Sequence, residues 1–431
     1  MRNCIILIAI LLQACSATEQ EIQTVKSPTC DLTYTRYQAT VTGLCQEPKA
    51  ELLANVPIEE RKIEIRPIEE IPEIFWYSQK MSYTLVKQQG EAPLAFVIAG
   101  TGAAHNSAKN IILQKTLFAQ GYHVIGLSSP TFANYIINSN NDQMIGDLTK
   151  DAVSLYKTMQ IILKDVQKNE DIKASSFVLT GYSLGGAHAA FVAKLDESEQ
   201  QFNFEKVLMI NPPVSLLNSV RILDSYIDIK NNRPAISAMF DRIFERFADV
   251  YADQESSKFT EESIYELFEG ADMGDEELKL LIGSSFRLSS SDMLYAIDSI
   301  YNVGAIKYKN HQVSKFESLT DSMHRANTLT FENYFDKGML PWTQNIEPGV
   351  NRDELIARLS LRSIEEYLVN AKKISVVHNA DDIILADGEI EYLQQVFGER
   401  AKVFERGGHM GNIDRVDFIN YISGQFAGAA L

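Results

Sequence analysis

Residues 177 to 191, FVLTGYSLGGAHAAF, constrain the fold of this chain more than any other segment. The apolar start of this segment is typical of a buried strand, and the small residues after GYSLG predict a closely packed helix. Between them, Ser183 lies in a turn where Gly181 and Gly185 leave room for the chain to reverse. The segment therefore predicts a strand, a sharp turn and a helix, with a serine hydroxyl projecting beyond the sheet.

A serine in this position is suited to nucleophilic attack. The backbone N–H of Leu184 and the start of the following helix would lie beside its hydroxyl, where they can stabilise the oxyanion of a tetrahedral intermediate. The same five-residue pattern also occurs in glycine-rich turns that hold a solvated serine. The strand before Ser183 and the helix after it favour the nucleophile.

Composition excludes several other classes of function. The formal net charge of -17 disfavours nucleic acids and anionic membrane surfaces as partners. The four cysteines and seven histidines show no zinc-binding spacing and no His-Glu-x-x-His sequence, so we expect no metal. No organic cofactor is implied either. With 431 residues, the chain can bury a large core and carry more than one structural unit.

The N-terminal residues are typical of a targeting segment. Arg2 precedes an apolar run, from Ile5 to Leu12, that is too short to span a bilayer. The run leads into LQAC, which resembles the lipobox of bacterial lipoproteins. This resemblance implies a signal peptide at 1–14, a lipid on Cys15 and, because Ser16 follows, anchoring in the outer membrane facing the periplasm. The alternatives are a plain signal peptide or a buried strand.

The remaining cysteines suggest one disulfide. Cys4 would leave with the signal peptide and Cys15 would carry the lipid, so Cys30 and Cys45 are left as a pair. In an oxidising compartment we expect them to be bonded, and the alternative is two free thiols. Residues 15–30 are mostly polar and are predicted to form a tether.

Strands alternate with helices in two regions, 31–214 and 371–431. Short alternating runs early in the first region predict antiparallel strands, and from residue 93 buried strands alternate with helices. We therefore predict an α/β fold with a mostly parallel sheet. The expected antiparallel strands lie at 34–41, 62–68 and 81–86, and the buried ones at 94–100, 122–129, 177–180, 206–210 and within 372–385.

Residues 215–370 interrupt this alternation with helical patterns and no clear strand. One expected helix begins at Asn351, a good N-cap, and runs to Leu368. The position of this segment predicts an all-helical cap or lid inserted in the core. Its apolar stripes either form its own core or cover Ser183. The loop GMLPW (338–342) is the expected lining of an acyl pocket.

A nucleophilic serine needs a base, and the base needs an orienting carboxylate. His409 is the strongest candidate base, because ERGGHMGN places it in a glycine-flanked loop after an apolar stretch. His188 is expected to pack in the core, and His105 either lines the site or lies on a loop surface. Asp381 and Asp382 directly follow an apolar strand, where burying two carboxylates for structure alone would be costly. The alternative is a solvated turn.

With these motifs the chain resembles the α/β-hydrolase superfamily from about residue 62 onward. GYSLGG, HNADDIIL and GGHMGN follow the family order of nucleophile, acid and histidine. The family pattern Gly-x-x-Asp-x-x-Val aligns Asn379 with the glycine and Asp382 with the acid, which makes Asp381 the weaker candidate. The family's His-Gly oxyanion sequence is replaced by AGTG (99–102), so the resemblance implies that Thr101 or a neighbour supplies the second oxyanion N–H.

The sequence therefore predicts a lipid-anchored serine hydrolase that cleaves a carboxylic ester or thioester through an acyl-enzyme. Ser183 would attack, His409 would transfer the proton and Asp382 would orient His409. A small-molecule acyl substrate is the expected partner, beside the membrane that holds the lipid anchor. The alternatives are a serine peptidase or amidase of the same fold, and a non-catalytic binding lipoprotein of the envelope.

Overall fold

The computed structural model describes residues 34–44, 48–139, 144–227, 233–251, 261–268 and 271–427. The predicted signal peptide, the tether, the lipidated Cys15 and the disulfide between Cys30 and Cys45 depend on residues outside these ranges. Within the described ranges, no helix is long and apolar enough to cross a membrane.

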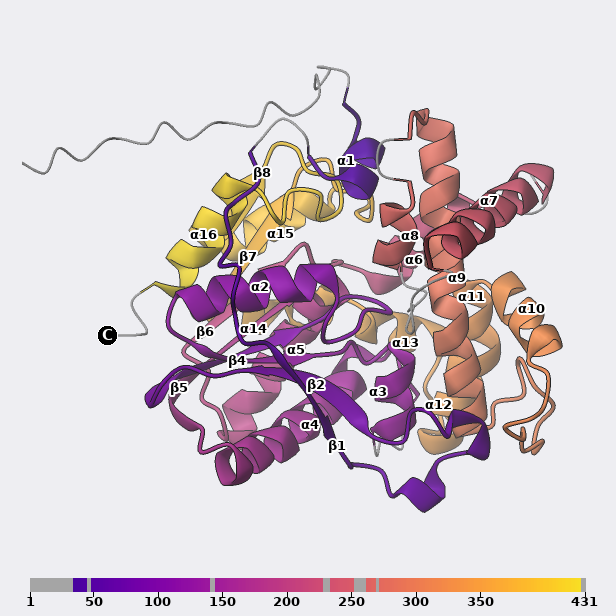
Figure 1. Ribbon diagram of the computed structural model, residues 1–431, viewed down its shortest axis with the longest axis horizontal. Coiled ribbons are helices and arrows are strands. Elements are labelled where there is room, and N and C mark those ends of the chain that lie inside the picture. The colour runs from indigo at the N-terminus through magenta and orange to yellow at the C-terminus, as the bar shows by residue number, and fades with distance from the viewer. Residues whose placement is uncertain are drawn as a thin grey trace, which may run out of the picture.

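The described strands form one eight-stranded sheet in the order β1-β2-β4-β3-β5-β6-β7-β8 (Figure 1). β2 is antiparallel to both of its neighbours, and the other adjacent strands are parallel. This confirms the predicted fold class, a mostly parallel sheet that opens with antiparallel strands. The strands are β1 (Glu59–Ile63), β2 (Met81–Val86), β3 (Glu91–Ile98), β4 (His123–Leu127), β5 (Lys173–Tyr182), β6 (Lys206–Ile210), β7 (Ile374–Asn379) and β8 (Ala401–Phe404).

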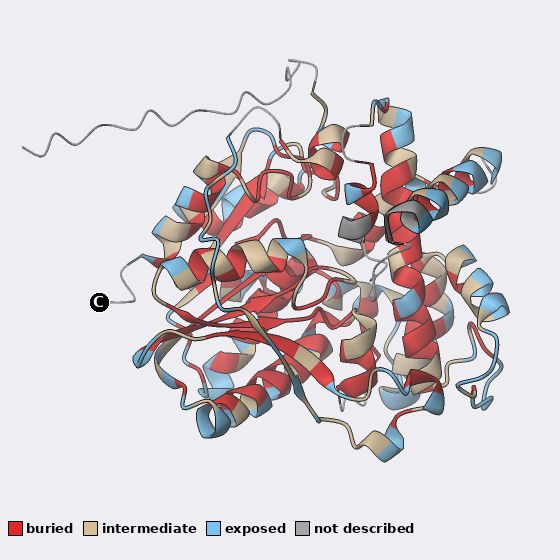
Figure 2. Cartoon of the chain, viewed as in Figure 1, coloured by how far each residue is buried: buried red, intermediate tan, exposed pale blue. Residues whose placement is uncertain are grey.

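Helices cover both faces of the sheet, because successive side chains of the central strands are apolar and point to opposite faces. On β3, Leu94, Phe96 and Ile98 belong to the core beneath α4 and α5, whereas Ala95 and Val97 belong to the core beneath α2 and α16. Figure 2 shows that the strands at the centre of the sheet are buried along their length. The covering helices are α2 (Ala108–Ala119), α4 (Leu148–Asn169), α5 (Leu184–Glu199), α14 (Glu365–Asn370), α15 (Glu389–Phe397) and α16 (Val416–Phe426).

The described part of 215–370 is helical and contains no named strand, as predicted. Most of these helices gather beside one end of the sheet (Figure 1). The segment has an isolated bridge between Ser215, its first residue, and Ser360, near its end. We call it the helical insertion. Its other helices are α6 (Leu216–Ser225), α7 (Arg233–Tyr251), α8 (Glu261–Glu266), α9 (Asp275–Tyr301), α10 (Thr320–Thr328), α11 (Phe331–Tyr334), α12 (Leu340–Ile346) and α13 (Arg352–Arg358).

Three predicted elements differ from the structure. Residues 34–41, predicted as a strand, instead lie in and before the helix α1 (Arg36–Thr42), which a capping box at Thr35 begins. The strand predicted at 62–68 is β1, which already ends at Ile63. The single helix predicted from 351 to 368 is split into α13 and α14, because the chain between them forms the bridge at Ser360.

Candidate active site

Ser183 lies in the turn between β5 and α5, as the sequence predicts. Its φ of 52° and ψ of -128° are uncommon for a residue with a side chain. A Cβ on Gly181 would collide with the Gly185 carbonyl, and a Cβ on Gly185 would collide with the Ile98 carbonyl. The two glycines therefore allow the close packing that makes the chain turn sharply at Ser183.

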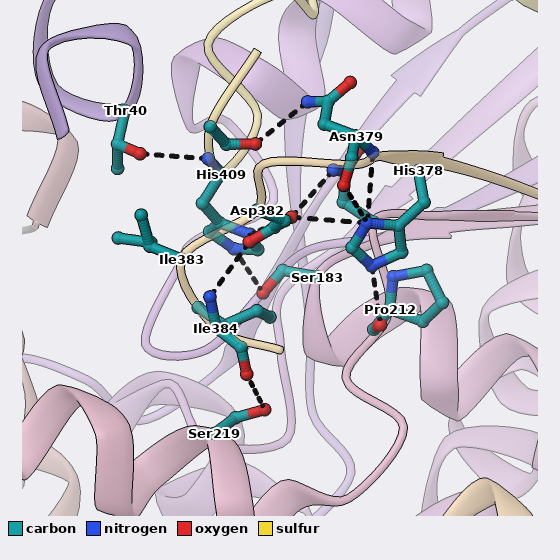
Figure 3. A network of polar contacts seen from close by, with 12 residues as sticks. Thr40, Ser183, Pro212, Ser219, His378, Asn379, Asp382, Ile383, Ile384 and His409 are labelled. Atoms are coloured by element: carbon teal, nitrogen blue, oxygen red, sulfur yellow. Dashed lines mark hydrogen bonds and ion pairs between the residues drawn. The ribbon is translucent and has the colours of Figure 1, made fainter. Parts of the chain in front are cut away.

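Ser183, His409 and Asp382 form one hydrogen-bonded chain (Figure 3). His409 Nε2 lies 3.0 Å from Ser183 Oγ, and Nδ1 lies 3.0 and 3.1 Å from the two carboxylate oxygens of Asp382. Asp382 follows β7 and His409 lies in the loop after β8. Because the carboxyl ends of parallel strands meet at one edge of the sheet, three residues far apart in sequence converge there.

The surroundings of Asp382 stabilise its ionised form. Burial by itself would raise the pKa of this carboxyl, but His409, His378 and Asn211 outweigh burial and bring the pKa below its ordinary value. Asn211 Nδ2 donates to Oδ2 at 2.9 Å, and the Ile384 N–H donates to Oδ1 at 3.0 Å. Asp382 is therefore a buried carboxylate that can accept the Nδ1–H of His409.

Asp381 has a different partner. Its Oδ1 accepts the backbone N–H of Gly408 at 2.8 Å, so it contacts the histidine loop (residues 405–413) rather than the imidazole. Burial raises the pKa of Asp381, although the amides of Gly407 and Gly408 act in the opposite direction. Of the two adjacent aspartates, Asp382 is the one against the imidazole.

The two backbone amides predicted to bind an oxyanion lie at the starts of two segments beside Ser183. Leu184 is the first residue of α5, where N–H groups have no partner within the helix. Thr101 lies in the turn after β3, which approaches Ser183 so closely that a Cβ on Gly100 would lie 3.0 Å from Ser183 Cβ. The amide of Gly102 already donates to Thr131 Oγ1 at 2.8 Å, which favours Thr101 over this neighbour.

Four other histidines are buried: His105, His123, His188 and His378. His188 is buried, with Nε2 3.3 Å from Asp151 Oδ2, which confirms its predicted place in the core. His105 is 1% exposed and does not line the cavity at Ser183, so neither position expected for it is correct. His123 and His378 lie in β4 and β7.

Asn379, the last residue of β7, fastens the histidine loop to the sheet. Its Nδ2 donates to the Gly408 carbonyl and to Asn412 Oδ1, both at 2.9 Å, and Asn412 Nδ2 donates back to Asn379 Oδ1 at 2.8 Å. A Cβ on Gly407 would overlap the Asn379 amide. The sequence showed that Asn379 replaces the family glycine, but it did not predict that Asn379 would hold the histidine loop.

Two more residues of the site were not predicted. Asn211 follows β6 and donates to Asp382, and a polar residue at the end of a buried strand was its signal. Thr40, in α1, accepts the backbone N–H of His409 at 2.9 Å. No signal pointed to Thr40, because its segment was predicted to be a strand.

Two adjoining cavities lie at Ser183. The first, of about 70 Å³, is lined by Ser183, His409 and residues of α6 and α9. The second, of about 50 Å³, is apolar and shares Thr101, Leu216 and Val220 with the first. Its other lining residues are Thr131, Ile145, Gly146, Leu184, Leu217, Met293, Phe331, Tyr334, Phe335, Met339 and Leu359.

The segment GMLPW, predicted to be a loop, is helical, because a π-helical turn at 335–339 leads into α12. Of its apolar residues, Met339 lines the apolar cavity. Trp342 instead packs edge-on against Tyr301, with ring centroids 5.5 Å apart. The described residues contain no group of three or more His, Cys, Asp or Glu that could hold a metal ion.

No protein-family model matches the sequence, and no curated protein matches it. Similar solved structures include a thioesterase domain from the curacin biosynthetic pathway, with 11% identity over 86% of this chain and 99% of that chain and a TM-score of 0.35. An esterase from Pseudomonas putida shows 12% identity over 88% of this chain and 84% of that chain, with a TM-score of 0.41. Carboxyl esterase 2 from the mycorrhizal fungus Tuber melanosporum shows 11% identity over 90% of each chain, also with a TM-score of 0.41. The order and directions of the strands, with Ser183 between β5 and α5, give this chain the α/β-hydrolase fold.

Proposed function

We propose that the protein is a serine hydrolase that cleaves a carboxylic ester or thioester through an acyl-enzyme. The observation that carries this proposal is the unbroken hydrogen-bonded chain from Ser183 through His409 to the buried Asp382, next to a cavity. An uncharged serine hydroxyl is a weak nucleophile, and this arrangement supplies both the base and the carboxylate that it needs.

The geometry supports two half-reactions. As Ser183 Oγ attacks the carbonyl carbon, His409 Nε2 accepts its proton, and the N–H groups of Leu184 and Thr101 hold the oxyanion. His409 then gives the proton to the leaving alcohol or thiol. His409 next takes a proton from a water molecule, which attacks the acyl carbon. The bond to Ser183 Oγ then breaks, His409 returns the proton to this oxygen, and the acid is released. Throughout, Asp382 holds the Nδ1–H and stabilises the imidazolium.

The two cavities suggest where the two parts of the substrate bind. We place the acyl group in the apolar cavity beside Leu184 and Thr101, and the leaving group in the cavity at His409. The mostly apolar lining of this cavity suits a hydrophobic acyl chain. Since α6 and α9 line the leaving-group cavity, the helical insertion acts as a cap over Ser183 in this proposal.

The first experiment tests the nucleophile. A fluorophosphonate probe should label the wild-type protein and leave Ser183→Ala unlabelled. Hydrolysis of p-nitrophenyl acetate should fall by several orders of magnitude in the variant, with nearly the same melting temperature. Retained turnover in Ser183→Ala would remove this residue from the mechanism. A wild-type protein that neither labels nor hydrolyses acyl esters or amides would favour the non-catalytic binding protein.

We also propose that the mature chain is anchored in the bacterial outer membrane by a lipid on Cys15, after cleavage of a signal peptide at 1–14. The short apolar run before the LQAC sequence supports this proposal. In the same compartment, Cys30 and Cys45 would form a disulfide. Mass spectrometry of the non-reduced protein tests that bridge, which free thiols at both positions would exclude.

A further inference from the structure

Helix α1 lies between the histidine loop and the helical insertion. Figure 1 shows α1 between the yellow C-terminal segment on one side and helices α8 and α9 of the insertion on the other. The described residues before β1 include no strand of the sheet, but α1 joins the histidine loop to the helical insertion.

On one side, α1 packs against the backbone of the histidine loop. Thr40 Oγ1 accepts the His409 N–H at 2.9 Å (Figure 3). It also donates to the Arg36 carbonyl at 2.8 Å, so the hydroxyl is used both as acceptor and as donor. Thr40 is only 6% exposed. A Cβ on Gly408 would collide with the Arg36 carbonyl, so a glycine there permits this close approach.

On its other side, α1 is fixed to the helical insertion. Thr35 Oγ1, at the N-cap of α1, donates to Asp275 Oδ1 at 2.8 Å. Tyr37 packs edge-on against Tyr226 with ring centroids 5.9 Å apart. Tyr37 and Val41 share an apolar cluster with residues of α7, α8 and α9. The same cluster contains Ile383 and Ile384, which directly follow Asp382.

Residues at the end of β7 hold the histidine loop at Gly408, the residue before His409. Asp381 and Asn379 both bind the backbone of Gly408, at its N–H and its carbonyl respectively. The backbone N–H of His409 itself is bound by Thr40. Without that bond a part-buried N–H would lose its partner, and the loop would be free to shift relative to Ser183.

We propose that Thr40 is a positioning residue, whose hydroxyl fixes the backbone of His409 so that the imidazole lies between Asp382 and Ser183. This inference rests on the proposed hydrolase function. Its physical basis is that a displacement of about 1 Å in a reacting group can cost on the order of 100-fold in rate. The contacts of α1 with the insertion and with the residues after Asp382 hold Thr40 beside the backbone of His409.

The test compares three substitutions in the full-length protein. Thr40→Val keeps the shape of the side chain and removes the acceptor, whereas Thr40→Ser keeps the hydroxyl. Thr42→Val is the matched control, because the Thr42 hydroxyl also donates within α1, to the Gln38 carbonyl at 2.9 Å. Steady-state hydrolysis is measured with two acetate esters that differ only in their alcohol, together with the melting temperature of each variant.

Thr40→Val should lower kcat about 10- to 100-fold for both esters, with KM changed less than about twofold. Thr40→Ser should restore most of the rate, and Thr42→Val should resemble the wild type. Because Thr40 also lines the cavity at Ser183, a contact with substrate is the competing explanation. Such a contact would raise KM, or would affect the two esters unequally.

Wild-type kcat in Thr40→Val would overturn the inference, as would a change in KM alone. Equal losses in Thr40→Ser and Thr40→Val would also overturn it, since the hydroxyl would then not matter. An equal loss in Thr42→Val with a matching fall in melting temperature would show that α1 acts only through stability. If the wild type is inactive and unlabelled by the fluorophosphonate, the proposed function fails and this inference fails with it.

Discussion

Asp381 and Asp382 are adjacent in sequence, but the protein shifts their pKa values in opposite directions. Burial raises the pKa of Asp381 above the ordinary 3.8, and the amides of the histidine loop offset this only in part. Burial would raise the pKa of Asp382 as well, but two histidines and Asn211 outweigh it and bring the pKa below 3.8. Position relative to the imidazole therefore separates two residues that composition cannot distinguish.

These shifts predict opposite effects of pH on stability. The folded pKa of Asp382 is lowered, so its contribution is complete above 3.8 and is lost as the pH falls through the folded pKa. The folded pKa of Asp381 is raised, so its contribution is greatest below 3.8 and declines as the pH rises through the folded pKa. Denaturant unfolding at a series of pH values measures both contributions.

The quantity to follow is the unfolding free energy of the wild type minus that of the variant. On acidification this value should decrease for Asp382→Asn and increase for Asp381→Asn. The two variants control for each other, because each replaces one carboxylate by an amide of the same shape. Trends in the same direction for both would contradict the assignment of partners.

The same two variants predict a ranking in activity. Asp382→Asn should lose about 10³- to 10⁴-fold in kcat, because the imidazole would lose its orienting charge and its correct tautomer. Asp381→Asn should lose much less, since an amide oxygen can still accept the Gly408 N–H. The kinetics of ester hydrolysis measure both losses, and a reversed ranking would assign the orienting role to Asp381.

Residues of the site differ in how far sequence could predict them. Ser183, Asp382 and His409 lie in short motifs whose own neighbours shape the local backbone, so they could be identified. Thr40 and Asn211 act on partners 369 and 171 residues away along the chain. Their roles depend on which segments meet in space, and no local pattern encodes that.

At the scale of elements, α1 shows how a short amphipathic helix can be mistaken for a strand. The helix has seven residues, about two turns, and over so short a span apolar residues at helical spacing also resemble alternation. The usable signal was the capping box of Thr35 with Gln38, in which each side chain binds the other's backbone. In contrast, the strands expected at 94–100 and 122–129 were apolar enough for β3 and β4 to be predicted within a few residues.

The π-helical turn before α12 leads to a prediction about chain-length preference. This turn ends at Met339, which lines the apolar cavity. Met339→Ala should enlarge that cavity and raise kcat/KM for butyrate and hexanoate esters relative to acetate. It should also destabilise the protein by about 2–5 kcal/mol. Relative kcat/KM values across p-nitrophenyl esters of increasing length measure the effect.

Trp342→Ala is the matched control for this prediction, because Trp342 belongs to the same segment but packs against Tyr301. It should lower stability and leave the preference for acyl length unchanged. An unchanged preference in Met339→Ala, or an equal change in both variants, would remove the apolar cavity from the acyl site.

For the whole molecule, the sequence indicated where the sheet is interrupted, because strand–helix alternation stops near residue 215 and resumes near 371, and β6 and β7 lie on either side of this gap. It could not give the order of the strands, since any parallel pairing would satisfy the same buried, apolar pattern. β6 and β7, for example, are neighbours in the sheet although the whole insertion separates them in the chain.

A prediction at this scale concerns the attachment of the chain to the envelope. Cys15→Ala should abolish palmitate labelling and either release the protein from membrane pellets or leave it with an uncleaved signal peptide. Ser16→Ala, which changes the next residue and keeps the cysteine, is the control for lipid attachment. Labelling of Cys15→Ala at the wild-type level would contradict the lipid anchor.

The bridge between Ser215 and Ser360 has a consequence for how the segment between them could be replaced. At the bridge, the Leu216 N–H donates to the Leu359 carbonyl at 2.8 Å and the Leu361 N–H donates to the Val214 carbonyl at 2.9 Å. The two points where the chain leaves and re-enters the core are thus adjacent, so a segment of another length could be exchanged there as a cassette without altering strand order. Any replacement would still be constrained by α1, which lies outside the exchanged segment. The new segment would have to supply a surface against which α1 can pack.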